Sequence, residues 1–238
     1  MSVTITILYD NRSDNCLLQE GWGFSALIEY LGFKILFDTG SDAEAFSKNA
    51  ALLQLPYQKI THLLFSHKHS DHITGFKKIV EMMGKDTALY LPKTFPWLLV
   101  RHGSKHLKNT TVVRSFEAIA PHIYSLVLRG GFWMYEQALI LKTPKGLGII
   151  TGCAHPGIVE IIKAAQNKLQ DTVAFVLGGF HQFRSSSDEC AQIVQQFQKI
   201  GVQKAAPCHC SGDMLINQFQ EAYGENFCKV GTGTVLTF

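Results

Sequence analysis

The feature that most constrains this chain is a cluster of metal-binding side chains just after a short apolar strand. Three histidines and one aspartate occur within six residues, behind an apolar run that ends at Phe65. Because alternate residues of an extended segment point to the same side, His67 and His69 are able to reach one metal ion. If the chain then turns into a helix, Asp71 and His72 point to a second position nearby. Imidazole nitrogens with a carboxylate suit zinc, and manganese or iron less selectively, so this stretch predicts a metal site.

Hydrophobic periodicity predicts an alternation of strands and helices along the rest of the chain. Strands are predicted over residues 3–8, 24–30, 33–37, 60–65, 87–91, 110–114, 123–128, 138–142, 147–150, 172–177, 204–207 and 229–238. Helices are predicted to follow N-caps at Ser41 or Asp42, Ser187 or Asp188, and Ser211 or Asp213, and to cover residues 75–83 and 157–169. Residues 92–108 form the least regular segment.

The order of these elements predicts the fold class. Strands come first in each half of the chain, and helices then interleave with strands. Two mixed sheets that pack face to face, with helices outside, fit this order. We therefore predict an α/β fold, a four-layer αββα sandwich of two mixed β-sheets flanked by helices, in a single domain over residues 1–238.

Composition and charge are typical of a soluble protein with a sizeable core. The chain has 238 residues, of which 46% are hydrophobic and 17% charged. Its formal charge of +3 is too small to argue for nucleic-acid binding, and no apolar run approaches the length of a membrane span. The N-terminus reads as a strand and lacks the features of a signal peptide. Six cysteines in a chain of this length do not suggest a disulfide framework, so we expect reduced thiols and a cytoplasmic location.

Further motifs accompany the histidine cluster. The predicted strand 33–37 ends in Asp38-Thr39-Gly40, and the other motifs are Gly23–Glu29, Glu136–Leu139, Thr151–Ile158, Gly178–His181 and Pro207–Cys210. Together with His-x-His-x-Asp-His after an apolar strand, they closely resemble the signature of the metallo-β-lactamase fold superfamily. Within it, they resemble the branch of predicted metal-dependent hydrolases that includes the dihydropterin-type synthase proposed for methanopterin biosynthesis. The motifs extend over nearly the whole chain.

The resemblance implies a site for one or two metal ions. The first ion is assigned to His67, His69 and His155, and the second to Asp71, His72 and His209. The implied metal is zinc, with manganese or iron as alternatives. Asp38 is expected to lie beneath the metal loop and to orient its ligands by hydrogen bonds.

The residue after Gly152 departs from the superfamily pattern. Most members that bind two ions have a bridging aspartate after such a glycine, whereas this chain has Cys153. Either the Cys153 thiolate binds or bridges the ions, or Cys153 is a small buried residue in a site with fewer ligands. In the second case a single ion is expected. Cys208 and Cys210 flank His209 and are interpreted as structural, because strand alternation turns them away from its face.

His181 is a further candidate for a functional role. It follows Gly178 and Gly179 at the end of the most apolar strand, where glycines let a ligand approach the backbone. Substrate binding, acid–base catalysis and metal binding are open to it, and a packed core histidine is the alternative. His62 is expected to be packed and His122 to lie in a loop. Four basic residues either contact an anionic or phosphorylated substrate or form a solvated loop: Arg101, Lys105, Lys108 and Arg114.

Three functions follow from these residues and the resemblance. A metal ion lowers the pKa of bound water, so the first is a hydrolase whose hydroxide attacks a small-molecule ester, lactone or phosphodiester. Asp71 is expected to steer the water proton and His181 to contact the leaving group. The second function, implied by the branch resemblance, is a dihydropterin-type synthase. The third is a catalytically silent protein that binds a small ligand at its metal site.

Overall fold

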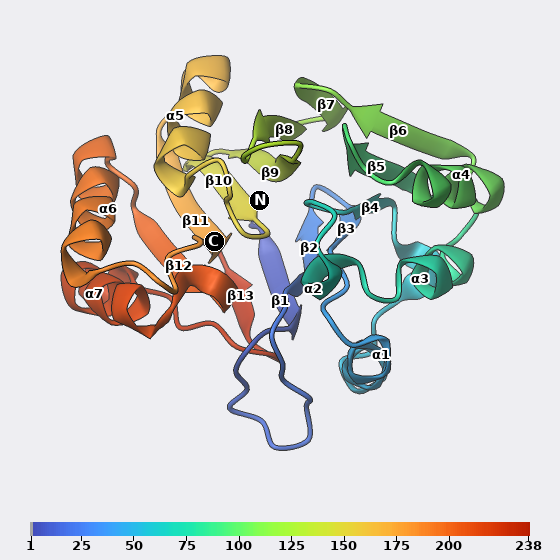
Figure 1. Ribbon diagram of the computed structural model, residues 1–238, viewed down its shortest axis with the longest axis horizontal. Coiled ribbons are helices and arrows are strands. Elements are labelled where there is room, and N and C mark those ends of the chain that lie inside the picture. Colours follow the sequence, from blue (N-terminus) through green and yellow to red (C-terminus); the bar gives the residue numbers. More distant parts are fainter. Residues whose placement is uncertain (1) are drawn as a thin grey trace.

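The computed structural model describes residues 2–238, and its centre is formed by two mixed β-sheets whose outer faces are covered by helices (Figure 1). Within these residues, one sheet has seven strands in the order β13-β1-β2-β3-β4-β5-β6. The other has six strands in the order β12-β11-β10-β9-β8-β7. The predicted four-layer αββα sandwich is confirmed.

The larger sheet changes from antiparallel to parallel pairing at β3. Its strands are β1 (Thr4–Tyr9), β2 (Ser25–Tyr30), β3 (Phe33–Phe37), β4 (His62–Leu64), β5 (Ala88–Pro92), β6 (Asn109–Val113) and β13 (Val235–Thr237). Pairing is antiparallel from β13 to β3 and parallel from β3 to β6. Tyr30 pairs with Phe33, so Leu31 and Gly32 form a tight hairpin turn between β2 and β3.

The smaller sheet shows the same change of pairing at β10. Its strands are β7 (Phe116–Ala120), β8 (Ile123–Arg129), β9 (Tyr135–Thr143), β10 (Gly146–Thr151), β11 (Val173–Gly179) and β12 (Lys204–Cys208). Pairing is antiparallel from β7 to β10 and parallel from β10 to β12. Each sheet therefore has a parallel half in which successive strands end at the same edge, the usual place for a site.

The helices form the two outer layers. Those that follow strands of the larger sheet are α1 (Ala43–Leu52), α2 (Ser70–Ile73), α3 (Phe76–Met82) and α4 (Trp97–His106). Those that follow strands of the smaller sheet are α5 (Ile158–Leu169), α6 (Ser187–Ile200) and α7 (Asp213–Tyr223). Three short 3₁₀ turns also occur in the described part of the chain: η1 (Tyr57–Lys59), η2 (His209–Ser211) and η3 (Gly224–Asn226). No helix within residues 2–238 has both the length and the apolar character needed to cross a membrane.

Three apolar layers hold the sandwich together. The central layer lies between the sheets, where Ile28 and Phe37 pack with Leu139, Ile150 and Phe175. The other two layers lie between each sheet and its helices. A polar link joins the sheets beside the histidine motif, because the buried Gln137 side chain donates to the carbonyls of Phe65 and Tyr90. The end of β4 is therefore fixed against β9, and with it the start of the motif.

Helix caps follow the sequence closely but not at every position. Asp42 caps α1 by accepting from the backbone of Glu44 and Ala45, as predicted. The cap of α6 is Ser186, one residue before the predicted position, because Ser186 and Glu189 form a reciprocal capping box. The sequence signal was present in the spacing of these two residues.

Three predictions of secondary structure need correction. The segment 92–108, expected to be irregular, contains α4. Its apolar side chains Trp97 and Leu98 are exposed, and only the partly buried Leu99 and Val100 pack against the core, so its apolar face is hard to recognise from the sequence. The edge strand β7 was not predicted, and β13 covers only three residues of the range 229–238. Edge strands carry weak periodicity because much of each lies outside the core.

Candidate metal centre

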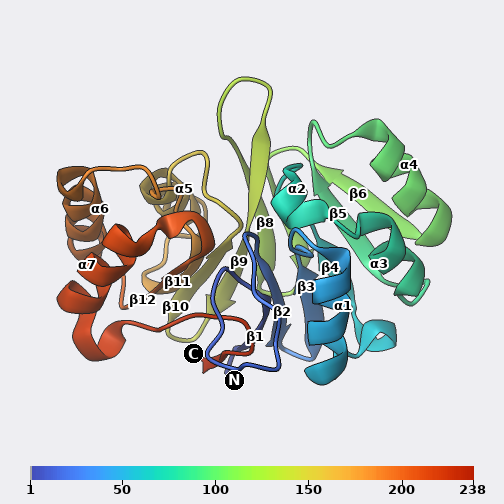
Figure 2. The same ribbon diagram turned by 60° about the horizontal axis from the view of Figure 1, so that its bottom comes forward.

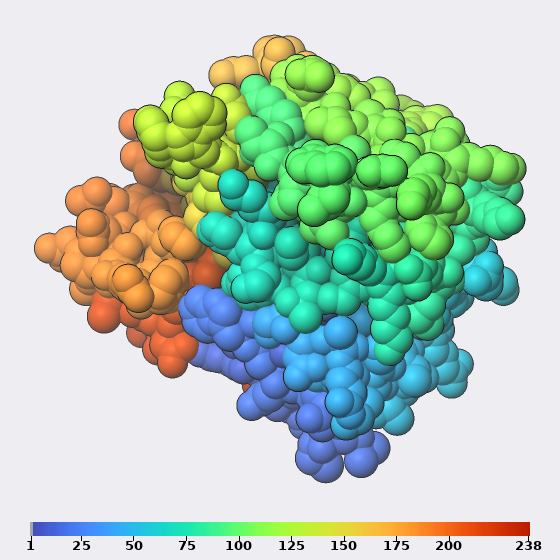
Figure 3. Space-filling view, turned by 45° about the vertical axis from the view of Figure 1, so that its right-hand side comes forward, coloured from blue at the N-terminus to red at the C-terminus, as the bar shows by residue number. Residues whose placement is uncertain are grey.

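Strand ends from both sheets carry the candidate ligands. His67 and His69 follow β4, and the one-turn helix α2 carries Asp71 and His72. The segment after β10 carries Cys153 and His155, and β12 leads into the 3₁₀ turn that begins at His209. In Figure 3, segments far apart in sequence meet around a hollow: the blue N-terminal loop, the teal residues after β4, the yellow-green turn between β8 and β9, and the orange-to-red C-terminal quarter.

The first group of donors consists of three histidines. Their ring centroids are 4.6 Å apart for His67 and His69, 4.6 Å for His67 and His155, and 4.8 Å for His69 and His155. One nitrogen of each ring lies within 4.8 Å of the others. Three imidazoles at this separation match the ligand set of a zinc site with one open position.

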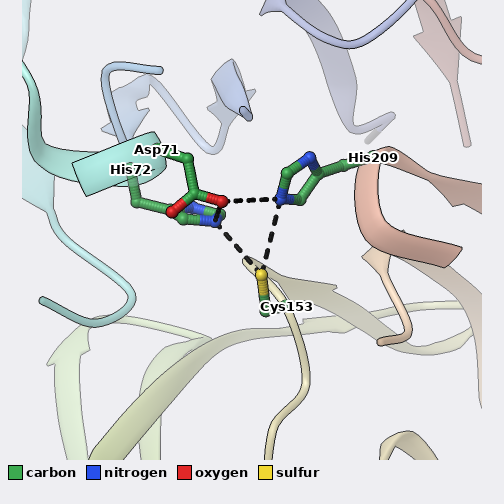
Figure 4. A group of neighbouring side chains, drawn as sticks. All are labelled: Asp71, His72, Cys153 and His209. Carbon is green, nitrogen blue, oxygen red and sulfur yellow. Dashed lines mark hydrogen bonds and ion pairs between the residues drawn. The ribbon is translucent and has the colours of Figure 1, made fainter. Parts of the chain in front are cut away.

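The second group surrounds the thiol of Cys153 (Figure 4). Its Sγ lies 3.2 Å from Nε2 of His72 and 3.4 Å from Nε2 of His209. Oδ2 of Asp71 lies 3.6 Å from Nε2 of His72 and 3.4 Å from Nε2 of His209. Sulfur, nitrogen and oxygen donors therefore converge on one small volume, as the ligands of a single ion do.

Cys153 and His181 connect the two groups. Cys153, His155 and His181 also offer donor atoms within 4.8 Å of one another. The rings of His155 and His181 are 4.3 Å apart, and His181 is exposed. The structure thus brings together every residue that the sequence singled out as a ligand, and it places Cys153 where both groups meet.

The backbone at the site is held in an uncommon conformation. Asp38, Ala154, His181 and His209 all have left-handed backbone angles, with φ of 57°, 59°, 54° and 48°. For a residue with a β-carbon this conformation raises the energy by about 1 kcal/mol or more, so it occurs mainly where the surrounding structure imposes it. Here it turns the chain at the strand ends that carry the donors.

Asp38 and Ser66 fix the rings of two histidines. Asp38 accepts hydrogen bonds from the backbone and hydroxyl of Ser66, each at 2.6 Å, and from Nδ1 of His72 at 2.7 Å. The Ser66 hydroxyl donates to Asp38, so it accepts from Nδ1 of His67 at 2.9 Å. With the proton on Nδ1, each ring keeps the lone pair on Nε2, the atom that faces the centre. Asp38 therefore has the orienting geometry expected of it.

Glu136 and Asn11 hold the other two rings, and the sequence did not single out either role. The buried Glu136 carboxylate accepts from three backbone amides, those of Cys153, Ala154 and His155, and from Nδ1 of His155 at 2.7 Å. Burial opposes ionisation, but the nearby His67 and His155 and these hydrogen bonds hold the pKa of Glu136 well below its usual range. Asn11 Oδ1 accepts from Nδ1 of His209 at 3.0 Å.

Burial favours the neutral form of His67 and His72 and the protonated form of the Cys153 thiol. It lowers the pKa of His67 well below its usual value and that of His72 to about 3. It also raises the pKa of the Cys153 thiol well above its usual value. Neutral imidazoles are ready to bind a cation, and a coordinated thiol loses its proton outright.

One atom in particular indicates that a metal ion fits the site. Nε2 of His67 is buried and has no hydrogen-bond partner among residues 2–238. A buried nitrogen with an unused lone pair is costly, and it is rarely left without a partner. An ion held with His69 and His155 satisfies it, and the neutral donor set matches zinc.

Comparison with known proteins shows which families and folds the chain resembles. A family model for the beta-lactamase superfamily domain matches residues 34–120, which include the histidine motif. The chain is 26% identical to the 7,8-dihydropterin-6-methyl-4-(beta-D-ribofuranosyl)-aminobenzene-5'-phosphate synthase of Methanocaldococcus jannaschii, over 92% of this chain and 90% of that protein. The crystal structure of Tm1679, a metal-dependent hydrolase of the beta-lactamase superfamily, matches with a TM-score of 0.80 and 26% identity over 98% of both chains.

The chain has the metallo-β-lactamase fold, and its sequence is similar to members of that superfamily. It shares the fold of a metal-dependent hydrolase of the beta-lactamase superfamily, and it resembles the branch that includes the synthase. A shorter segment is 43% identical to ribonuclease Z of Borrelia duttonii, but this match spans 26% of the chain and 18% of that protein. It reflects one shared segment and carries no argument for RNA as the substrate.

The remaining candidates of this metallo-β-lactamase-fold chain lie around the site or away from it. Cys208 packs in the central core, whereas Cys210 lies beside the site with its Sγ 3.6 Å from the Cys153 carbonyl. The interpretation of Cys210 as turned away is therefore wrong, because η2 follows His209 directly and ends the strand alternation. His62 is buried, and His122 lies in an exposed turn. Of the basic residues, Lys108 pairs with Asp86 at 2.5 Å.

An open cavity adjoins the second group. Its volume is about 560 Å³, and its lining includes Trp22, Phe183 and His209. Trp22 packs edge-on against Phe183 and donates from Nε1 to Oδ2 of Asp71 at 3.1 Å. Asp71 is thus fixed from the cavity side, and a substrate in this cavity lies beside the candidate donors.

Proposed function

We propose that this protein is a zinc-dependent hydrolase that cleaves an ester, lactone or phosphodiester bond in a small molecule. The observation that supports the proposal is the convergence of two donor groups, each with histidine nitrogens close enough to share one ion. In four of these rings Nδ1 is engaged by Ser66, Asp38, Glu136 or Asn11. Such an arrangement is costly in a protein that does not bind metal, because it leaves Nε2 of His67 buried without a partner.

We assign the donors to two neighbouring ions. The first ion is held by His67, His69 and His155, and the second by Asp71, His72, Cys153 and His209. Cys153 takes the place of the carboxylate that is common in the superfamily. Its Sγ also lies within 4.8 Å of a ring nitrogen of His155, which belongs to the first group. A thiolate is a strong zinc ligand, so the second ion is retained without a carboxylate at this position.

The chain's own residues then direct the reaction. Bound divalent ions acidify water and polarise the oxygen of a carbonyl or phosphoryl group. Asp71, fixed by the Trp22 indole, holds the proton of the attacking water. His181 is exposed beside His155 and contacts the leaving group, to which it gives a proton. The Trp22–Phe183 pair lines the adjoining cavity and excludes water from one side of the substrate.

We place the enzyme in the cytoplasm, with a soluble substrate. All six cysteines are free within residues 2–238, and a reducing compartment keeps Cys153 available as a ligand. The open cavity beside His209 fits a small molecule and argues against a nucleic acid. An anionic or phosphorylated substrate agrees with the ability of the ions to bind phosphoryl oxygens.

A synthase reaction on a dihydropterin is the second candidate. It is favoured by the 26% identity to the Methanocaldococcus jannaschii synthase over nearly the full length of both chains. In that reaction the metal organises the substrates and Asp71 has no water to orient. Asp71 remains a metal ligand in both candidates, so they differ in whether the protein turns over the model substrates of a hydrolase.

The test is turnover of model substrates by the zinc-loaded protein. A panel of p-nitrophenyl esters, a phosphodiester and a lactone is assayed with the parent, Asp71→Asn and His122→Ala, which alters an exposed histidine outside the site. We expect turnover that a chelator abolishes, a loss of at least 100-fold in Asp71→Asn and no change in the control. Metal-loaded protein that cleaves none of these substrates would argue against the hydrolase.

A further inference from the structure

A second cluster of metal-binding side chains lies between α3 and α4, two helices that follow strands of the larger sheet. These helices lie side by side in Figures 1 and 2, and Figure 3 turns this side of the molecule to the front. His102 and His106 are four residues apart on α4, so their rings project from the same face of the helix. Glu81 reaches them from the last turn of α3.

The three side chains are close enough to share one ion. Nε2 of His102 lies 3.3 Å from Oε1 of Glu81, and Nε2 of His106 lies 3.9 Å from the same oxygen. The two rings have centroids 4.5 Å apart and planes inclined by 33°. One donor atom from each residue lies within 4.8 Å of the others. This separation is typical of three ligands around a single ion.

One donor atom of this cluster is left without a hydrogen bond. Nε2 of His102 is buried and makes no geometrically sound hydrogen bond within residues 2–238, although Glu81 lies opposite. Only 18% of the His102 side chain is exposed, and its ring packs near Phe76 of α3. The nitrogen is therefore fixed in place and faces the carboxylate across a gap that an ion would fill.

We propose that Glu81, His102 and His106 bind a zinc-class divalent transition-metal ion, separate from the metal centre. Two imidazoles at positions i and i+4 of a helix, with one carboxylate, form a ligand set that zinc uses elsewhere in proteins. Nickel and copper favour the same nitrogen donors. Side-chain exposures of 39% for His106 and 51% for Glu81 leave room for a water molecule as the remaining ligand.

Binding here joins two elements near the histidine motif. Only Thr74 and Gly75 separate α2, which carries Asp71 and His72, from α3. An ion between α3 and α4 therefore restrains the helix that directly follows the motif. Since the ion binds the folded protein and not the unfolded chain, it raises the melting temperature without taking part in the reaction.

The experiment counts metal on tag-free protein. The parent, His106→Ala and Glu81→Gln are dialysed to equilibrium against buffered free Zn²⁺, and zinc per chain is measured by elemental analysis. Both variants alter exposed side chains, so the fold should be retained, and circular dichroism checks this. His122→Ala removes an exposed histidine outside the cluster and serves as the control.

The proposal predicts one zinc ion fewer per chain in both variants than in the parent and in the control. It also predicts a smaller zinc-dependent rise in melting temperature in the variants, with hydrolase activity unchanged. Equal zinc in parent and variants would overturn it and would leave a metal-free histidine–glutamate ion pair. Because activity and zinc count are read separately, failure here is distinct from failure of the proposed hydrolase.

Discussion

Replacement of Glu136 by glutamine tests whether the carboxylate sets the tautomer of a metal ligand. Glu136 Oε1 accepts from the amides of Cys153 and Ala154, and Oε2 accepts from the amide and Nδ1 of His155. A glutamine amide keeps one oxygen and places an NH₂ group where the other stood. Whichever way it turns, two buried N–H donors lose their acceptor.

The expected cost of Glu136→Gln follows from these contacts. Each buried donor without a partner costs about 1–3 kcal/mol, so two cost about 2–6 kcal/mol of folding free energy or of local order. If the NH₂ group faces His155, Nδ1 must accept and the proton moves to Nε2, which then cannot bind metal. Loss of such an orienting partner typically lowers metal affinity about 10–100-fold.

The assay is a zinc titration of metal-free protein against a chromophoric chelator, together with thermal unfolding. Glu160→Gln is the matched control, because Glu160 is an exposed glutamate on α5. We expect at least a 10-fold loss of affinity in Glu136→Gln and none in Glu160→Gln. Affinity within twofold of the parent in Glu136→Gln, with the fold intact, would refute the orienting role of Glu136.

Three further predictions follow from the site and its surroundings. His181→Ala should lower kcat about 10²–10⁴-fold and leave the zinc content unchanged, whereas a loss of zinc would make His181 a ligand. Gly152→Ala should destabilise the protein by about 1–3 kcal/mol in urea unfolding, because the added Cβ would lie 2.2 Å from Oγ of Ser66; an unchanged midpoint would contradict this contact. Burial lowers the pKa of His62 below 6.5, against the opposing hydrogen bond to the Ile119 carbonyl. The unfolded chain therefore takes up this proton first as the pH falls, so the folded protein loses stability below pH 6.5. His62→Gln should weaken this dependence of stability on pH, and a His62 pKa of 6.5 or higher in an NMR titration would disprove the shift.

The sequence was most informative where periodicity and ligand chemistry act locally. His67, His69, Asp71 and His72 could be identified because strand alternation and a following helical turn place them without help from distant residues. The two mixed sheets were predictable for the same reason, since strands with a buried face carry a clear pattern. The N-cap at Asp42 followed from local side-chain chemistry.

The sequence was least informative about partners brought together by the fold. Glu136 lies between two predicted strands, and its role depends on the backbone amides and the His155 ring of the turn after β10, which only the fold brings beside it. Asn11 lies in a polar loop and meets His209 from almost 200 positions away. The helix α4 escaped notice because its apolar residues Trp97 and Leu98 face outward. For Glu136 and Asn11, a contact between residues distant in sequence decides the role of the side chain.

The central claim is that the site binds two ions and that the Cys153 thiolate holds the second. It is tested by zinc per chain, measured by elemental analysis in a His106→Ala background so that the peripheral cluster adds nothing. We predict two zinc ions per chain with Cys153 present and one in Cys153→Ala. Two ions in the alanine variant, or one or none in the parent after zinc is supplied, would contradict the account.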